Sequence, residues 1–261
     1  MHLASKIVDF FFPRHCINCS TPWAYLCKPC KKELHPHPEI CPYCHRASKD
    51  YLTCIECRTN KDNALEGIII PFAYNTPRPG QSSGVLKTLI IKLKYFHKKD
   101  ISNFLIERLA IALQVNQIIQ KQFNFPPLLR GGVRRTEGFV NSPVLISFIP
   151  SHRYRHYFTK GYNQSELLAD KLSKYIQIPM ITIANKYKHT KTQASLDRNG
   201  RLHNLKNAFS LAKNLTLTGN ETLLIIDDIT TTWSTINELA KLVKHHYPNI
   251  KVWWVVLGRH M

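Results

Sequence analysis

The sequence of 261 residues lacks any apolar run that approaches the ~18–20 residues needed to cross a lipid bilayer. The N-terminal stretch MHLASKIVDFFFP has a short apolar patch, but Lys6 and Asp9 interrupt it, and no signal-peptide cleavage pattern follows. We interpret this stretch as one or two helical turns that pack on a domain. The sequence therefore predicts a cytoplasmic protein without a transmembrane segment.

Acidic residues are scarce, because 17 Asp and Glu stand against 36 Lys and Arg, which gives a formal net charge of +19. The excess is uneven. The segment from Arg78 to Lys160 holds 14 basic and 3 acidic residues, a net of +11, whereas residues 1–60 carry a net of only +3. Such a field attracts nucleotides, sugar phosphates, nucleic acid or an anionic membrane surface. A solvated basic face without a specific partner is the alternative.

No cysteine occurs after residue 57, and all eight lie in four C-x2-C pairs. Because one such pair presents two thiolates and a tetrahedral zinc site needs four, the pairs predict two structural zinc sites. A disulfide framework is the alternative, which adjacent C-x2-C pairs without a secretion signal disfavour. We expect sequential rather than cross-braced pairing within a knuckle domain of residues 1–60, with Cys16, Cys19, Cys27 and Cys30 at one site and Cys41, Cys44, Cys54 and Cys57 at the other.

Residues 61–261 show apolar, β-branched runs that alternate with amphipathic segments. This pattern is typical of a parallel sheet that is covered on both faces by helices, so we expect an α/β domain. Residues 123–142 contain Gly and Pro without a period and are interpreted as a long loop or insertion. We expect strands at 67–74, 144–150, 180–186, 222–229 and 251–258, and helices at 83–95, 101–120, 163–176 and 234–246.

Two adjacent acids, Asp227 and Asp228, end the apolar strand TLLIIDDI, and five Thr or Ser hydroxyls lie around the start of the next helix. A helix start offers unpaired N–H groups that bind phosphate, while carboxylates accept hydrogen bonds from sugar hydroxyls and hold Mg2+ through water. Ligands of open parallel sheets bind beyond the carboxyl ends of the strands. The combination predicts a site for a ribose 5-phosphate. An ordinary N-cap by Ser234 or Thr235 is the alternative, and it leaves both acids unexplained.

The stretch DDITTTWST resembles the D-D-[VI]-x-T-T-G-x-T signature of type I phosphoribosyltransferases, which bind phosphoribosyl pyrophosphate (PRPP). The resemblance implies a type I phosphoribosyltransferase-like parallel sheet flanked by helices. It also implies that Asp227 and Asp228 contact the ribose hydroxyls and that Mg2+ binds together with PRPP. The residues that the resemblance assigns to the phosphate-binding loop are Thr230, Thr231, Thr232, Trp233, Ser234 and Thr235.

Four knuckles followed by such a domain are similar to the ComF-type proteins associated with natural competence for DNA uptake. Their R-G-F-N-Q pattern corresponds here to KGYNQ, so that Lys160 stands where the family has Arg. Trp233 stands where the phosphate loop has Gly; it is strained if that position requires a positive φ, and compatible with phosphate binding if the residue is already helical. The pattern T-x-x-Q-x-x-L…R-x-x-N…AF is matched in order and spacing by Thr190, Gln193, Leu196, Arg201, Asn204, Ala208 and Phe209.

The same resemblance implies two further parts of a PRPP site. A loop after the first core strand would hold pyrophosphate, and it would consist of Phe148, Ile149, Pro150 and Ser151 with Arg153 and Arg155 behind it. Lys160 of the KGYNQ pattern is also assigned to the ligand. A loop between the second and third core strands would close over the ligand through Lys191, Gln193 and Arg201, for which a solvated linker is the alternative. Every cysteine belongs to a knuckle, so no glutaminase nucleophile is apparent, and the acceptor of the phosphoribosyl group is left open.

Two functional hypotheses follow. The first is a PRPP-binding phosphoribosyltransferase that uses Mg2+. The second is a non-enzymatic competence factor in which the PRPP site is regulatory or vestigial. In that second case the knuckles and the basic segment would bind single-stranded DNA or DNA-uptake proteins. Cations mixed with aromatic side chains are typical of single-strand binders, and such a mixture is formed here by Lys87, Lys92, Lys94, Tyr95 and Phe96. An amphipathic helix with a solvated face is the alternative for these residues.

Overall fold

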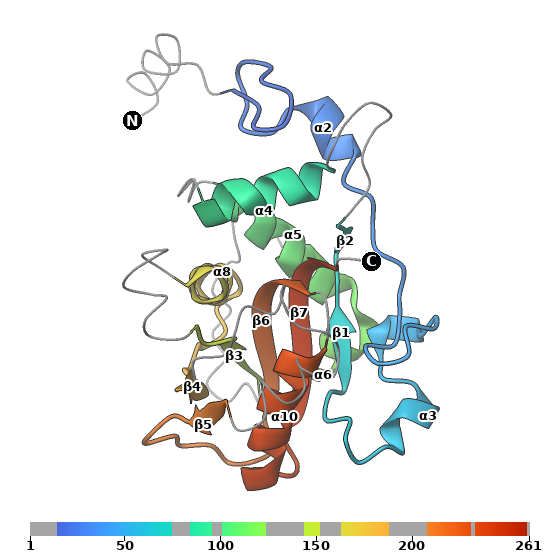
Figure 1. The fold of residues 1–261 in the computed structure, drawn as a ribbon, viewed down its shortest axis with the longest axis vertical. Helices are drawn as coiled ribbons and strands as arrows, with labels where there is room; N and C mark the ends of the chain where they lie inside the picture. The colour runs from blue at the N-terminus through green and yellow to red at the C-terminus, as the bar shows by residue number, and fades with distance from the viewer. Residues whose placement is uncertain are drawn as a thin grey trace.

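The computed structural model describes residues 15–74, 84–95, 101–123, 144–151, 163–187, 208–230 and 233–259, with residues 94, 95, 122, 123 and 230 described by their backbone alone. Figure 1 shows a central sheet with helices on its two faces and the four-cysteine segments at its periphery. In chain order the elements are α2 (Lys28–Lys32), η1 (Lys49–Tyr51), α3 (Ile55–Arg58), β1 (Gly67–Ile69), β2 (Phe72–Ala73), α4 (Val85–Tyr95), α5 (Ile101–Val115), α6 (Gln117–Phe123), β3 (Val144–Phe148), α8 (Gln164–Ile176), β4 (Ala184–Lys186), β5 (Phe209–Leu211), β6 (Thr222–Thr230), α10 (Ser234–His246) and β7 (Lys251–Arg259).

The main sheet is parallel, with the strand order β1-β7-β6-β3 and with β2 extending the edge along β7. In its centre Thr222 of β6 faces Val144 of β3 on one side and Lys251 of β7 on the other. Helices cover both faces of the sheet, so successive side chains of a strand are all buried. The strands are therefore continuous apolar runs, without the alternation of apolar and polar residues that a half-exposed sheet shows. The predicted parallel α/β architecture is confirmed.

Two hydrophobic clusters show how the sheet is covered. On one face α4, α5 and α8 pack their Leu and Ile side chains against Leu224 and Ile226 of β6. On the other face α10 packs against Leu223 and Ile225 of the same strand. Because neighbouring residues of a strand point to opposite faces, one run of Leu and Ile supplies both cores. The carboxyl ends of β3, β6 and β7 therefore lie together at one end of the strands, and we call this end the carboxyl edge of the sheet.

The helix predicted over residues 101–120 is broken, since α5 ends at Val115 and α6 begins at Gln117. Asn116 causes the break. Its side chain is buried, its Oδ1 accepts a hydrogen bond from the N–H of Ile119 at 3.0 Å, and its Nδ2 donates to the carbonyl of Asp50 at 2.9 Å. The side chain therefore caps a new helix instead of continuing the old one. The apolar period alone did not reveal this contact with a distant residue.

Two predicted strands are shorter than expected. The strand at 67–74 is divided at Pro71, which has no N–H to donate to a ladder. The strand predicted at 180–186 forms one parallel bridge, from Met180 to Ile146, and then leaves the main sheet. Its last part is β4, which pairs antiparallel with β5, a strand that was not predicted.

Two predicted features lie outside the described residues: the N-terminal helical turns and, after Phe123 at the end of α6, the loop at 123–142. Among the parts of the chain that the structure does describe, none of the helices combines the length and apolar character that crossing a membrane requires.

Candidate functional site

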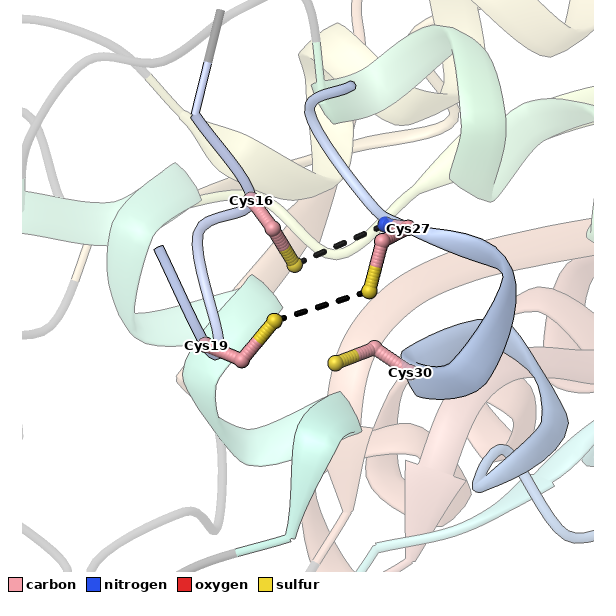
Figure 2. A group of neighbouring side chains, drawn as sticks. All are labelled: Cys16, Cys19, Cys27 and Cys30. Carbon is pink, nitrogen blue, oxygen red and sulfur yellow. Dashed lines mark hydrogen bonds between the residues drawn. The ribbon is translucent and has the colours of Figure 1, made fainter. Parts of the chain in front are cut away.

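The first four-cysteine cluster consists of Cys16, Cys19, Cys27 and Cys30, and Figure 2 shows their side chains pointing toward one another. All four sulfur atoms lie within 4.8 Å of one another, and Cys19 Sγ is 3.5 Å from Cys27 Sγ. A disulfide would need about 2.0 Å. Four thiolates at about 2.3 Å from a tetrahedral metal ion lie about 3.8 Å apart, so the observed spacing fits such an ion.

The second cluster consists of Cys41, Cys44, Cys54 and Cys57, whose sulfur atoms also lie within 4.8 Å of one another. Cys44 Sγ is 3.7 Å from Cys54 Sγ, which again fits a tetrahedral thiolate site rather than a disulfide. The predicted sequential grouping of the eight cysteines is therefore found in the structure. Each group offers four sulfur ligands, so each could hold one zinc ion.

Both clusters contain thiols of contrasting acidity. Hydrogen bonds with Thr21 lower the pKa of Cys19 to about 6. Burial opposes the ionisation of Cys44, but hydrogen bonds with Arg46 still lower its pKa to about 6. Burial raises the pKa of Cys30 and that of Cys57 to about 12. A metal ion must displace protons from the buried thiols, so binding to either cluster releases protons and weakens at low pH.

The two adjacent acids lie at the carboxyl end of β6, where the sequence placed them. Asp227 Oδ1 accepts hydrogen bonds from Ser165 Oγ and from the N–H of Asp228, both at 2.8 Å. Asp228 is buried, and its Oδ1 accepts from the N–H of Ile229 at 2.7 Å. These donors orient the two carboxylates.

The end of β3 and the start of α8 complete this edge of the sheet. Ile149 donates its N–H to the carbonyl of Ile226 at 3.1 Å, which places Pro150 and the exposed Ser151 beside the residues that precede the acids. Asn163 is the N-cap of α8: its Oδ1 accepts from the N–H of Ser165 at 3.1 Å and its Nδ2 donates to the carbonyl of Ile149 at 3.0 Å. The side chain of Asn163 thereby joins the loop after β3 to α8, the helix whose Ser165 donates a hydrogen bond to Asp227.

The start of α10 follows the same end of β6, since Ser234 is five residues after Ile229 along the chain. Its N-cap is Trp233, with φ −74° and ψ −6°. This backbone is already right-handed helical, so the Trp at the position of the family's Gly carries no positive-φ strain. The indole caps no N–H of the helix. The first turn holds Ser234, which is buried, and Thr235, which is partly exposed.

The structure thus brings Asp227, Asp228, Ser151 and the start of α10 to one edge of the sheet. Other predicted site residues lie outside the described parts of the chain, and their roles stay predictions: Thr231, Thr232, Arg153, Arg155, Lys160, Lys191, Gln193 and Arg201, together with the side chain of Thr230.

Sequence reasoning missed four contributors to this edge. Asn163 belongs to the KGYNQ pattern and Ser165 follows it directly, but their bonds to Ile149 and Asp227 require the folded sheet. Gln164 is also buried, and its Nε2 has no hydrogen-bond partner among the described residues. Arg259 is the register partner of Thr230 at the end of β7, and burial lowers the pKa of its guanidinium. No local pattern identified these neighbours.

The described residues define an α/β protein with a parallel sheet and two four-cysteine clusters. Along nearly its whole length the chain is similar to competence protein F of Haemophilus influenzae, with 29% identity over 250 residues that cover 93% of this chain and 96% of the relative. It is also similar to DNA utilization protein YhgH of Escherichia coli K12, with 28% identity over 248 residues, 92% of this chain and 96% of that protein. The Salmonella typhimurium protein of the same name is 26% identical over 248 residues.

No protein-family model matches the chain. The curated relatives, taken together with the two cysteine clusters, confirm the predicted resemblance to ComF-type proteins.

Proposed function

We propose that the chain binds PRPP together with Mg2+ at the carboxyl edge of the sheet and transfers its phosphoribosyl group to an acceptor, within a role in competence or DNA utilization. The observation that carries the proposal is the placement of two hydrogen-bonded carboxylates, Asp227 and Asp228, on the same edge as an unstrained helix start at Trp233. Carboxylates accept from ribose hydroxyls, and a helix start binds phosphate.

Each part of the site has a defined task in this proposal. Asp227 and Asp228 hold the ribose, and they are also the residues that would hold Mg2+ through water, which would neutralise charge on the pyrophosphate. The N–H groups at the start of α10 hold the 5-phosphate. Ser165 and Asn163 keep Asp227 in place from the side of α8. Basic side chains of the loops would take up the charge that develops on the leaving group.

The binding step is tested by calorimetry with PRPP and Mg2+ on the wild type and on the double variant Asp227→Asn with Asp228→Asn. Hydrogen bonds to charged groups contribute about 1.5–3 kcal/mol each, so loss of both charges should weaken binding by about 100-fold or more. Asp170→Asn is the matched control, because Asp170 is a carboxylate of α8 that pairs with Lys174 on the surface. Unchanged affinity in a folded double variant contradicts the proposal.

The two clusters are proposed as structural zinc sites. Their ligands are all thiolates and fill four positions, so the arrangement is typical of zinc that supports folding rather than catalysis. Metal analysis of protein purified without a chelator should find two zinc ions per chain. The transfer step is tested separately by pyrophosphate release with candidate acceptors, and PRPP binding without any release would favour a regulatory site.

A second candidate function, binding of single-stranded DNA, is favoured by the surface of the first cluster. Trp23 is 64% exposed and Tyr25 is 36% exposed, and the nearby α2 carries Lys28, Lys31 and Lys32. Aromatic faces beside cations are typical of single-strand binders, in which each stacked base contributes about 1–3 kcal/mol. Anisotropy with a labelled oligonucleotide should show an affinity that falls with salt and falls further in Trp23→Ala. Salt-independent binding that Trp23→Ala leaves unchanged contradicts this function.

A further inference from the structure

Tyr43 lies inside the first knuckle of the second cluster, between Cys41 and Cys44, yet its side chain points into the protein. Its hydroxyl donates to Asn237 Oδ1 at 2.6 Å and accepts from the N–H of Leu65 at 2.8 Å. A knuckle of the metal cluster is thereby bonded to a residue 194 positions further along the chain.

Asn237 belongs to the first turn of α10 and is only 1% exposed. Besides the bond from Tyr43, its Oδ1 accepts from the N–H of Ala64 at 3.0 Å, and its Nδ2 donates to the carbonyl of Asp62 at 2.7 Å. Its own N–H donates to the carbonyl of Trp233 at 2.9 Å, which is the hydrogen bond that closes the first helical turn. The residue whose main-chain N–H closes this turn is therefore bonded, through its side chain, to groups outside the helix.

The knuckle also contacts the residue before the helix. The ring of Tyr43 lies edge-on to the indole of Trp233, with the ring centroids 5.3 Å apart and an interplanar angle of 66°. Such edge-to-face pairs are attractive beyond the area that they bury. Tyr43 thus touches both ends of the first turn of α10, at residues 233 and 237, and the direction of the N–H groups of this turn depends on where Tyr43 is held.

We propose that Tyr43 is a positioning residue for the phosphate-binding start of α10, so that metal binding at the second cluster and PRPP binding at the sheet edge are coupled. The inference rests on the proposed function. A metal ion fixes the Cys41–Cys44 turn, the turn fixes Tyr43, and Tyr43 fixes the first turn of α10. Coupling between two binding events is reciprocal. PRPP must therefore raise the zinc affinity of the second cluster by the same factor by which zinc raises the affinity for PRPP.

The first cluster is an internal control, because it packs elsewhere. Cys16, Leu26 and Cys30 share a hydrophobic cluster with α4 and α5, and Lys31 lies over the ring of Phe104 at 5.5 Å. The coupling therefore predicts that PRPP slows the release of zinc from the second cluster and leaves the release from the first cluster unchanged.

The test uses the zinc-loaded wild type and the variant Tyr43→Phe, which keeps the ring but removes the hydroxyl. PRPP affinity with Mg2+ is measured by calorimetry, and zinc release to a coloured chelator is followed with and without PRPP. In Tyr43→Phe we expect two zinc ions per chain and a PRPP affinity about 3- to 10-fold weaker, because the buried hydrogen bond from Tyr43 to Asn237 of α10 is lost. We also expect a diminished effect of PRPP on zinc release.

The outcomes separate this inference from the proposed function. Wild type that binds PRPP, combined with a Tyr43→Phe variant of unchanged affinity and unchanged zinc protection, overturns the coupling alone. Wild type that binds PRPP without slowing the release of either zinc also overturns it. Failure of the wild type to bind PRPP overturns the proposed function and this inference with it. If Tyr43 has a purely structural role, Tyr43→Phe should release zinc faster in the absence of PRPP, but PRPP should slow that release by the same factor as in wild type. This result would also count against the coupling.

Discussion

The two four-cysteine clusters have the same ligand set and similar sulfur spacing, but they are attached to the protein in different ways. The first packs its apolar residues on α4 and α5, with an exposed lysine over an aromatic ring. The second is joined to the interior by buried hydrogen bonds: Thr53 Oγ1 donates to the carbonyl of Leu65 at 2.7 Å, and the Tyr51 hydroxyl donates to the carbonyl of Ile70 at 3.1 Å. In Figure 1, α2 is drawn at the top of the view, near α4, whereas α3 is drawn at the lower right, toward the side of β1.

This difference shows that the same cysteine pattern can be attached to a protein in different ways. A C-x2-C pair fixes where two sulfur atoms go, and the residues between and after the cysteines decide what the cluster holds in place. In the first cluster these residues include the exposed Trp23 and Tyr25, which face solvent. In the second they include Tyr43, which reaches α10. The first cluster therefore suits contact with a partner, and the second suits support of the candidate site.

The largest expected difference comes from removing one ligand of each cluster. Cys19→Ser and Cys44→Ser are matched, because each changes the second cysteine of the first knuckle, a thiol with a pKa of about 6. Both variants should bind one zinc ion instead of two. Coupling energies of about 1–3 kcal/mol imply that Cys44→Ser weakens PRPP binding by about 5- to 150-fold, measured by calorimetry. Cys19→Ser should leave the affinity unchanged, and an equal loss in both variants would remove the distinction between the clusters.

A smaller effect is expected from Asn116→Ala, which tests how the second cluster is anchored. The change leaves the carbonyl of Asp50, in the loop between Cys44 and Cys54, without its buried donor and removes the N-cap of α6. The free energy of unfolding should fall by about 1–3 kcal/mol in urea denaturation. The control is Val115→Ala, since Val115 is 72% exposed and its truncation should cost less than about 0.5 kcal/mol. Equal costs would refute the anchoring role of Asn116.

Glu221→Gln tests a region that belongs to neither cluster. It should lower the free energy of unfolding by about 1 kcal/mol at neutral pH. Burial opposes the charge of Glu221, but hydrogen bonds from Thr218 and from the N–H of Gly219 outweigh it and lower the pKa of its carboxyl group. A lowered pKa in the folded state adds stability above the unfolded value of about 4.3, and this stability is lost as the pH falls further. The difference between wild type and variant should therefore shrink in urea titrations below that pH. A constant difference would show that the charge is not responsible.

The smallest effect is expected at the first cluster. Lys31 Nζ lies 5.5 Å from the centroid of the Phe104 ring, and its side chain is exposed. Exposed cation–π contacts contribute about 0.5–1 kcal/mol at most, so Lys31→Ala should barely change the urea midpoint. If Lys31→Ala lowered the free energy of unfolding more than Asn116→Ala does, the first cluster would be the more firmly attached of the two, which would contradict this comparison.

Much of the fold was predictable because apolar patterns report burial directly. The strands predicted at 222–229 and 251–258 and the helix predicted at 234–246 were all found at or within one residue of their predicted bounds. The grouping of the cysteines was predictable as well, because short loops favour sequential pairing. These features depend on local sequence, which a single chain reveals.

The rest depends on contacts between distant residues. Asn116 ends a helix because Asp50 is there to accept its amide, and β5 exists because β4 turns away from the main sheet to meet it. The bond from Tyr43 to Asn237 and the bond from Ser165 to Asp227 span 194 and 62 positions, and neither leaves a periodic trace in the sequence. The sequence therefore predicted the local elements and the grouping of the cysteines better than the long-range bonds that join them.

The most direct test of the central claim is a crystal structure of the zinc-loaded protein with PRPP and Mg2+. The account predicts the 5-phosphate against the N–H groups of Ser234 and Thr235, with the ribose hydroxyls within hydrogen-bond distance of the carboxylates of Asp227 and Asp228. PRPP bound away from these carboxylates, or an α10 start closed to phosphate by the indole of Trp233, would contradict it.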